Sequence, residues 1–195
     1  MASKTEAMTM ASLPIRAVQL SVRYDRVEDR LLVLAMDAAG KSATMFMTRR
    51  LTTFLINELA KLLEKSSFQA RQAPVEHRDD VIMFEHQGAL QKIDQQGMAH
   101  RKDQSGQGPK SVDIGTGVKI PPSPHELVQS IEITTKPTVF EILIKGSKPL
   151  ASMVLKRSEL HQIVEMFRQK ADAAGWQIQI DIPWLAPQES VFVIN

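Results

Sequence analysis

The spacing of apolar residues changes from a period of two to a period of 3.6 at two places in this chain. Residues 18–24 alternate apolar and polar, two short apolar runs follow, and from Thr48 the apolar residues recur at helical spacing. The same change occurs again between the run ending at Leu155 and residues 160–171. Strands followed by an amphipathic helix, twice over, predict an α+β fold with antiparallel sheets, each covered on one face by a helix.

We expect two similar units, residues 14–95 and 125–195. Each is predicted to be an antiparallel meander of three to four strands, followed by one helix and a further strand. In the first unit Thr48 caps the helix, and an extra β-hairpin is expected from residues 81–84 and 89–93. In the second unit Ser158 caps the start of the helix, Gly175 ends it, and residues 176–182 form an amphipathic strand.

Two segments lie outside these units. Residues 1–13 are small and polar without a period, which predicts disorder. Residues 96–124 are rich in Gly, Pro, Ser and Gln and bury too little apolar surface to offset their ordering entropy, so a flexible linker or long loop is expected.

The two units also suggest an internal repeat. An offset of 108 residues places 43–49 over 151–157 without a gap and keeps the apolar positions of both helices in register. Identities are few, so duplication is an interpretation of matched apolar positions and matched element order. Because three strands and one helix make a thin core, we expect the halves to pack together about a pseudo-twofold axis.

Composition excludes several classes of protein. With no cysteine, the chain has no disulfide, thiol nucleophile or thiolate zinc site, which indicates a reducing, cytoplasmic compartment. The longest apolar run, residues 31–36, is far shorter than the roughly 18 residues of a membrane span. Residues 1–13 also lack the apolar core of a signal peptide. We therefore expect no membrane contact.

No motif in the sequence carries a reaction. The five histidines contain no pair at the i, i+4 spacing of a helical metal site. Residues 76–80 together with Glu85 and His86 are the densest group of ligand-type side chains, but a charged turn is more typical of solvated surface. We predict no catalytic residue, no metal ligand and no cofactor, and hence a protein that is not an enzyme.

Basic residues near the strand-to-helix junctions could meet if the halves pack symmetrically. One patch able to contact an anion or nucleic acid would then be formed by Arg49, Arg50, Lys145, Lys148, Lys156 and Arg157. The alternative is that these long side chains cover apolar surface at a sheet edge. The net charge of +2 is spread evenly along the chain and favours neither.

The end of the sequence is apolar and extended. A free edge of that character pairs with its own sheet or with another chain. We expect candidate partner contacts at Trp184, Leu185, Val191 and Phe192.

Two functions are consistent with these features. The first is a non-enzymatic protein-interaction or scaffold module, acting through a sheet edge or the C-terminal tail on a protein partner or on a second copy as a dimer. The alternative is a single-stranded nucleic-acid-binding protein, because a doubled meander plus helix resembles the layout of Whirly and PUR-type proteins.

The stretch Lys-Gly-Ser-Lys-Pro-Leu-Ala at 145–151 is similar to the Lys-Gly-Lys-Ala-Ala-Leu motif of Whirly proteins. The likeness covers seven residues, with an inserted Ser and a Pro substitution, and does not assign the chain to that family. Aromatic residues make up only 5% of the chain, which disfavours binding by base stacking.

Overall fold

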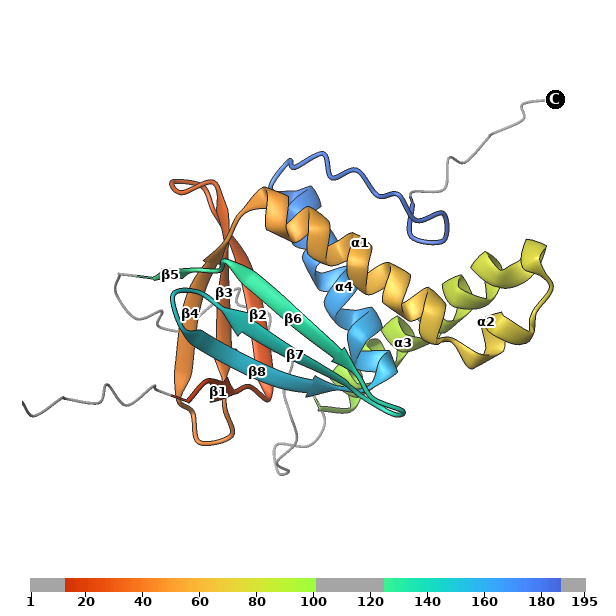
Figure 1. Ribbon diagram of the computed structural model, residues 1–195, viewed down its shortest axis with the longest axis horizontal. Coiled ribbons are helices and arrows are strands. Elements are labelled where there is room, and N and C mark those ends of the chain that lie inside the picture. Colours follow the sequence, from red (N-terminus) through yellow and green to blue (C-terminus); the bar gives the residue numbers. More distant parts are fainter. Residues whose placement is uncertain (1–12, 101–124, 187–195) are drawn as a thin grey trace, which may run out of the picture.

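The computed structural model describes residues 13–100 and 125–186. They form an α+β fold with four α-helices and two four-stranded sheets (Figure 1). Among these described residues no helix is long and apolar enough to cross a membrane.

The first sheet has the order β2-β3-β4-β5. Its meander consists of β2 (Gln19–Asp25), β3 (Arg30–Met36) and β4 (Ser42–Met47), as predicted, with antiparallel pairing throughout. All five residues from Leu31 to Ala35 are buried, because β3 is apolar without alternation and is covered on both faces. The fourth strand, β5 (Glu126–Leu127), comes from much later in the sequence and pairs parallel with β4.

The second sheet has the order β1-β8-β7-β6. Its antiparallel meander consists of β6 (Ser130–Thr135), β7 (Phe140–Lys145) and β8 (Pro149–Leu155). The fourth strand is β1 (Ile15–Arg16), which pairs parallel with β8. Each short strand that precedes a meander thus belongs to the sheet of the other meander, and the two sheets are interlocked.

Two long helices lie side by side against the sheets (Figure 1). Helix α1 (Arg49–Ser66) begins as predicted at Thr48, whose hydroxyl accepts a hydrogen bond from the Leu51 N–H at 3.3 Å. Helix α4 (Arg157–Ala173) begins two residues earlier than predicted, because Lys156 and not Ser158 is the N-cap residue. The buried faces of both helices join one core with both sheets.

Gly175 ends α4 as predicted. It has a φ of +71°, its N–H donates to the Asp172 carbonyl, and the N–H of Trp176 donates to the Ala171 carbonyl. This pair of bonds satisfies two of the free carbonyls at the helix end, and glycine takes the left-handed conformation without a Cβ penalty.

The β-hairpin predicted from residues 81–84 and 89–93 is wrong. The region instead forms α2 (Phe68–Gln72), the short 3-10 helix η1 (Val75–His77) and α3 (Arg78–His100). Ile82, His86 and Ala89 are buried at helical spacing, and acidic residues in the first turn of α3 suit a helix N-terminus. Helix α3 also takes in residues 96–100 of the predicted linker, and residues 101–124 lie outside the described residues.

The predicted strand at 176–182 is also not formed. Burial along this segment alternates at every residue, from a buried Trp176 to a buried Ile182, but the segment has no sheet ladder. Its backbone is bonded instead to side chains of α1. Arg49 donates to the Gln177 carbonyl at 3.2 Å, and Asn57 donates to the Gln179 carbonyl at 3.0 Å and accepts from the Asp181 N–H at 3.0 Å.

Candidate functional site

Helices α3 and α4 place four ionisable side chains in one buried line, which we call the polar row: Glu85, His86, His161 and Glu165. Glu85 and His86 are adjacent on α3, and His161 and Glu165 lie one turn apart on α4. The two histidines meet at the middle of the row, with their Nδ1 atoms 3.2 Å apart. His161 is 1% exposed and His86 and Glu165 are each 8% exposed, so three of the four groups are removed from water.

Each histidine also faces a carboxylate on its other side. His86 Nε2 lies 3.5 Å from Glu165 Oε2, and His161 Nε2 lies 3.8 Å from Glu85 Oε2. The order along the row is therefore carboxylate, imidazole, imidazole, carboxylate. Such a line can hold or share a proton without contact with solvent.

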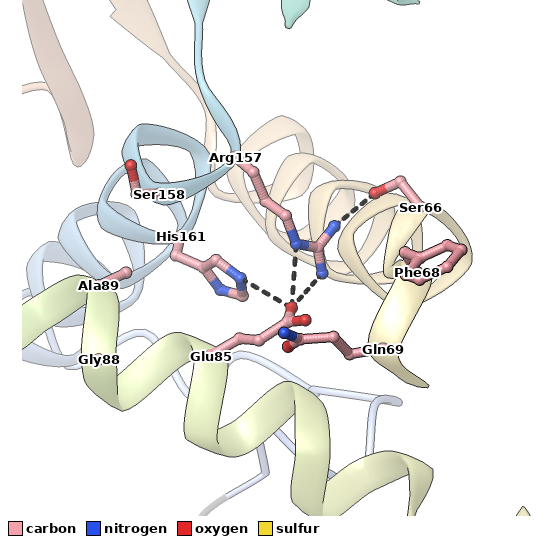
Figure 2. A pocket seen from close by; sticks show the side chains of 9 residues that line it. All are labelled: Ser66, Phe68, Gln69, Glu85, Gly88, Ala89, Arg157, Ser158 and His161. Atoms are coloured by element: carbon pink, nitrogen blue, oxygen red, sulfur yellow. Dashed lines mark hydrogen bonds and ion pairs between the residues drawn. The ribbon is translucent and has the colours of Figure 1, made fainter. Parts of the chain in front are cut away.

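An arginine closes each end of the row. At one end Arg157 donates through Nε to Glu85 at 2.9 Å and through Nη1 to the Ser66 hydroxyl at 2.6 Å (Figure 2). Its Nη2 donates to the Leu63 carbonyl at 2.7 Å. At the other end Arg168 donates to Glu165 at 2.7 Å. The Arg157 guanidinium thereby joins α4 to α3 and to the end of α1, whereas Arg168 pairs with Glu165 within α4.

These contacts keep the carboxylates ionised. Burial by itself raises the pKa of Glu85, but hydrogen bonds from His161, Ser67 and Arg157 hold that pKa at about 2. Burial likewise opposes the bonds from His86, Arg168 and Gln169 to Glu165, and the pKa of Glu165 is again about 2. Burial lowers the pKa of His161, and the neighbouring His86 lowers it further.

Residues 182–186, which we call the strap, cover the histidine pair. The ring of Trp184 lies edge-on to His86 at 5.4 Å and to His161 at 5.9 Å between ring centroids. Trp184 and Leu185 are 6% and 7% exposed, so these two predicted partner contacts are covered by the chain itself. The other two, Val191 and Phe192, lie outside the described residues.

An open cleft of about 530 Å³ adjoins the Glu85 end of the row. It is lined by Ser66, Phe68, Gln69, Glu85, Gly88, Ala89, Arg157, Ser158 and His161 (Figure 2). The charges on its floor, Arg157 and Glu85, are already paired with each other and with neighbouring groups. In Figure 2 the Ser158 hydroxyl points away from His161, so these two residues do not form a nucleophile and base pair.

The six basic residues of the predicted patch lie at separate places. Arg49 reaches Gln177, which follows the end of α4, whereas Arg157 at the start of α4 reaches the end of α1. The two helices are thus antiparallel, and their starts lie about 25 Å apart for helices of this length. Lys145 pairs with Glu132, while Arg50, Lys148 and Lys156 are exposed. The single patch expected from symmetric packing is not formed.

The group of residues 76–80 with Glu85 and His86 is also not brought together. His77 faces Asp80 on the surface at 3.5 Å, whereas Glu85 and His86 point into the polar row. Within the described ranges no three His, Asp or Glu side chains are placed to hold a metal ion.

A different kind of site lies at the free edge of β6. Lys136 N–H donates to the Val139 carbonyl at 2.9 Å, so by the antiparallel alternation the N–H groups of Thr135, Ile133 and Ile131 point away from β7. No strand among the described residues pairs with this edge. The corresponding first strand of the other meander, β2, packs against α4.

Sequence reasoning missed the polar row because His86 and His161 are 75 residues apart. One signal was present. Arg157, His161 and Glu165 recur every four residues on α4, and this spacing forms a charged stripe along one side of a helix.

Comparison with known proteins adds no relative: no family model, no curated protein and no solved structure matches the chain.

Proposed function

We propose that this protein is a non-enzymatic interaction module that associates with a second copy of itself through the free edge of β6. Strand β6, six residues long and without a partner on its outer edge among the described residues, carries this proposal. Such an edge offers a row of backbone donors and acceptors that another strand can satisfy. The polar row favours the same view, because its charges are paired within the chain and leave none free for a substrate in the cleft.

The residues of β6 suit antiparallel pairing with an identical strand. With Ile133 opposite its own copy, the outward backbone groups of both strands form bonds to each other. In this register Glu132 lies opposite Thr134 and no carboxylate faces another. Ile131 and Ile133, which are half-buried and packed against the core, would be covered further.

The two meanders differ at their first strands. Among the described residues β2 packs against α4, whereas the main contacts of β6 are with β7. Proline, lysine and β-bulges are common features that block edge pairing. Strand β6 contains neither residue and has no bulge against β7.

The proposal is tested by measuring mass in solution by light scattering, for the full chain and for two variants. Thr135→Pro removes one outward N–H at an exposed position, where proline is tolerated in an edge strand. Thr135→Ala, the matched control, keeps that N–H. We expect a dimer for the parent and for Thr135→Ala and a monomer for Thr135→Pro, with unchanged circular dichroism. A monomeric parent protein would overturn the proposal, as would a Thr135→Pro dimer.

Single-stranded nucleic-acid binding is a second candidate, favoured by one observation. The order of a short strand, a three-stranded meander and a helix occurs twice, as in the Whirly and PUR-type layout noted above, and we propose that it arose by duplication. A labelled single-stranded oligonucleotide would then bind with an affinity that falls as salt rises. Arg49→Ala combined with Arg50→Ala should weaken that binding, and absence of binding at low salt excludes this candidate.

A further inference from the structure

The histidine pair at the centre of the polar row has an uncommon proton requirement. Each imidazole faces a carboxylate through Nε2 and the other imidazole through Nδ1. A neutral imidazole has one N–H and one lone pair. The number of protons on the pair therefore decides how many of the three contacts can be favourable.

Two neutral imidazoles cannot satisfy the row. If both donate through Nε2 to their carboxylates, two Nδ1 lone pairs face each other at 3.2 Å. If one donates through Nδ1 instead, its Nε2 lone pair faces an ionised carboxylate. One additional proton on the pair satisfies all three contacts at once, because three N–H groups are then available. A second additional proton places two N–H groups against each other in the middle.

The pair lies where three parts of the chain meet. His86 belongs to α3, His161 to α4, and the Trp184 ring of the strap contacts both imidazoles. Residue 161 is almost fully buried, so an unfavourable contact there is not relieved by water. Separating the two rings requires α3 to move away from α4, and this movement also breaks the contact of the Trp184 ring with at least one imidazole.

We propose that His86 and His161 form a proton-operated latch, which holds α3 and the strap on α4 with one shared proton and opens when the pair takes up a second. This inference goes beyond the proposed self-association and does not depend on it.

The charged groups around the pair fit this behaviour. Among the described residues, α3 contributes Glu85, and α4 contributes Arg157, Glu165 and Arg168. The strap and the start of α2 contribute neutral groups, the Trp184 ring and the Ser67 hydroxyl. Two carboxylates stabilise one cationic pair, and the two arginines disfavour a further positive charge.

The direction of the pH effect follows from the unfolded chain. An unfolded histidine titrates near 6.5, whereas burial lowers the pKa of His161 in the folded protein. The unfolded or open form therefore binds the second proton more readily, so the closed form weakens as pH falls below about 6.5. The shared first proton is bound more tightly in the closed form than in the open chain, so the closed form also weakens at high pH, where that proton is lost. The stability contributed by Glu85 and Glu165 is lost separately, as pH falls from the ordinary glutamate pKa of 4.5 toward their folded-state pKa of about 2.

Trp184 fluorescence tests the latch. In a Trp176→Phe background Trp184 is the remaining tryptophan of the chain, and its quenching by acrylamide reports the opening of the strap. We expect quenching to rise several-fold between pH 7.5 and pH 5 while far-ultraviolet circular dichroism shows the sheets intact. His161→Gln should remove this transition, whereas the exposed His77→Gln should leave it unchanged. A flat titration of the parent would overturn the latch.

A second measurement needs no substitution in the row. Imidazole nitrogen chemical shifts at pH 7 should show three N–H protons on the His86–His161 pair. Two neutral rings would carry two, and two cationic rings would carry four. Two neutral rings at pH 7, or a His161→Gln protein that keeps the fluorescence transition, would contradict the proposal. If His161→Gln does not fold, the same titration of His86→Gln and the nitrogen shifts of the parent decide the matter.

Discussion

Helices α1 and α4 occupy corresponding places after their meanders, yet they use buried polar side chains in opposite ways. In α1 the neutral amide of Asn57 bonds the backbone of residues 179–181. In α4 the buried polar side chains are His161 and Glu165, which are joined to α3 by charge. A neutral amide makes a contact that is indifferent to pH, whereas a charged row is stronger and depends on its protons.

The largest loss of stability is expected when the charged contacts at the start of α4 are broken. Arg157→Ala leaves the Glu85 carboxylate without its guanidinium and the Leu63 carbonyl without its donor. Breaking such a half-buried pair should lower the free energy of unfolding by about 3 kcal/mol, as measured by urea denaturation.

Arg157→Lys provides the control, because it restores the charge without the fork. It should recover part of the loss, since a lysine cannot reach Glu85, Ser66 and the Leu63 carbonyl together. An Arg157→Ala protein as stable as the parent would show that the charged end of α4 contributes little.

A smaller loss of stability is expected when the Asn57 amide, the neutral anchor of residues 179–181, is removed. Asn57→Ala removes two hydrogen bonds to the extended segment and should cost about 2 kcal/mol, with no change between pH 7 and pH 5 beyond that of the parent. Thr53→Ala, one turn earlier and only half-buried, is the control and should stay within about 0.5 kcal/mol of the parent. Equal losses for both variants would count against the anchor.

The smallest effect concerns how α4 ends. Gly175→Ala forces a Cβ into a left-handed conformation and should cost about 1 kcal/mol in thermal or urea unfolding, although nothing lies within 4 Å of that Cβ. Gly88→Ala, in the interior of α3 and equally free of contacts, should instead stabilise by about 1 kcal/mol. The same sign for both substitutions would contradict the role assigned to Gly175.

Much of the fold could be predicted because periodicity marks strands and amphipathic helices directly. Helix α3 could not, since half of its buried stripe is polar. Ile82 and Ala89 are apolar, but Glu85 and His86 between them are buried only through their partners on α4. The apolar run beside Gln87-Gly88 therefore resembled a hairpin. The order of β1 and β5 in the sheets was equally hidden, because two-residue strands carry no period.

The candidate site was less predictable than the fold. Glu85 and His86 attracted attention as ligand-type residues, but the pairing with His161 depends on a helix packing that no local pattern encodes. The strand prediction at 176–182 identified the correct kind of backbone and the wrong partner, since side chains of α1 replace a neighbouring strand.

The interlocked sheets have a consequence for how the chain reaches this structure. Ile15 pairs with Ala151, and Met45 pairs with Glu126, so each sheet is completed only by a segment from the other part of the chain. Contacts so distant in sequence slow folding, because long loops must close before these contacts form. A nascent chain emerging from the ribosome cannot finish its first sheet until β5 has been synthesised, or its second until β8 has returned to β1. Neither half is expected to survive as a separately expressed fragment.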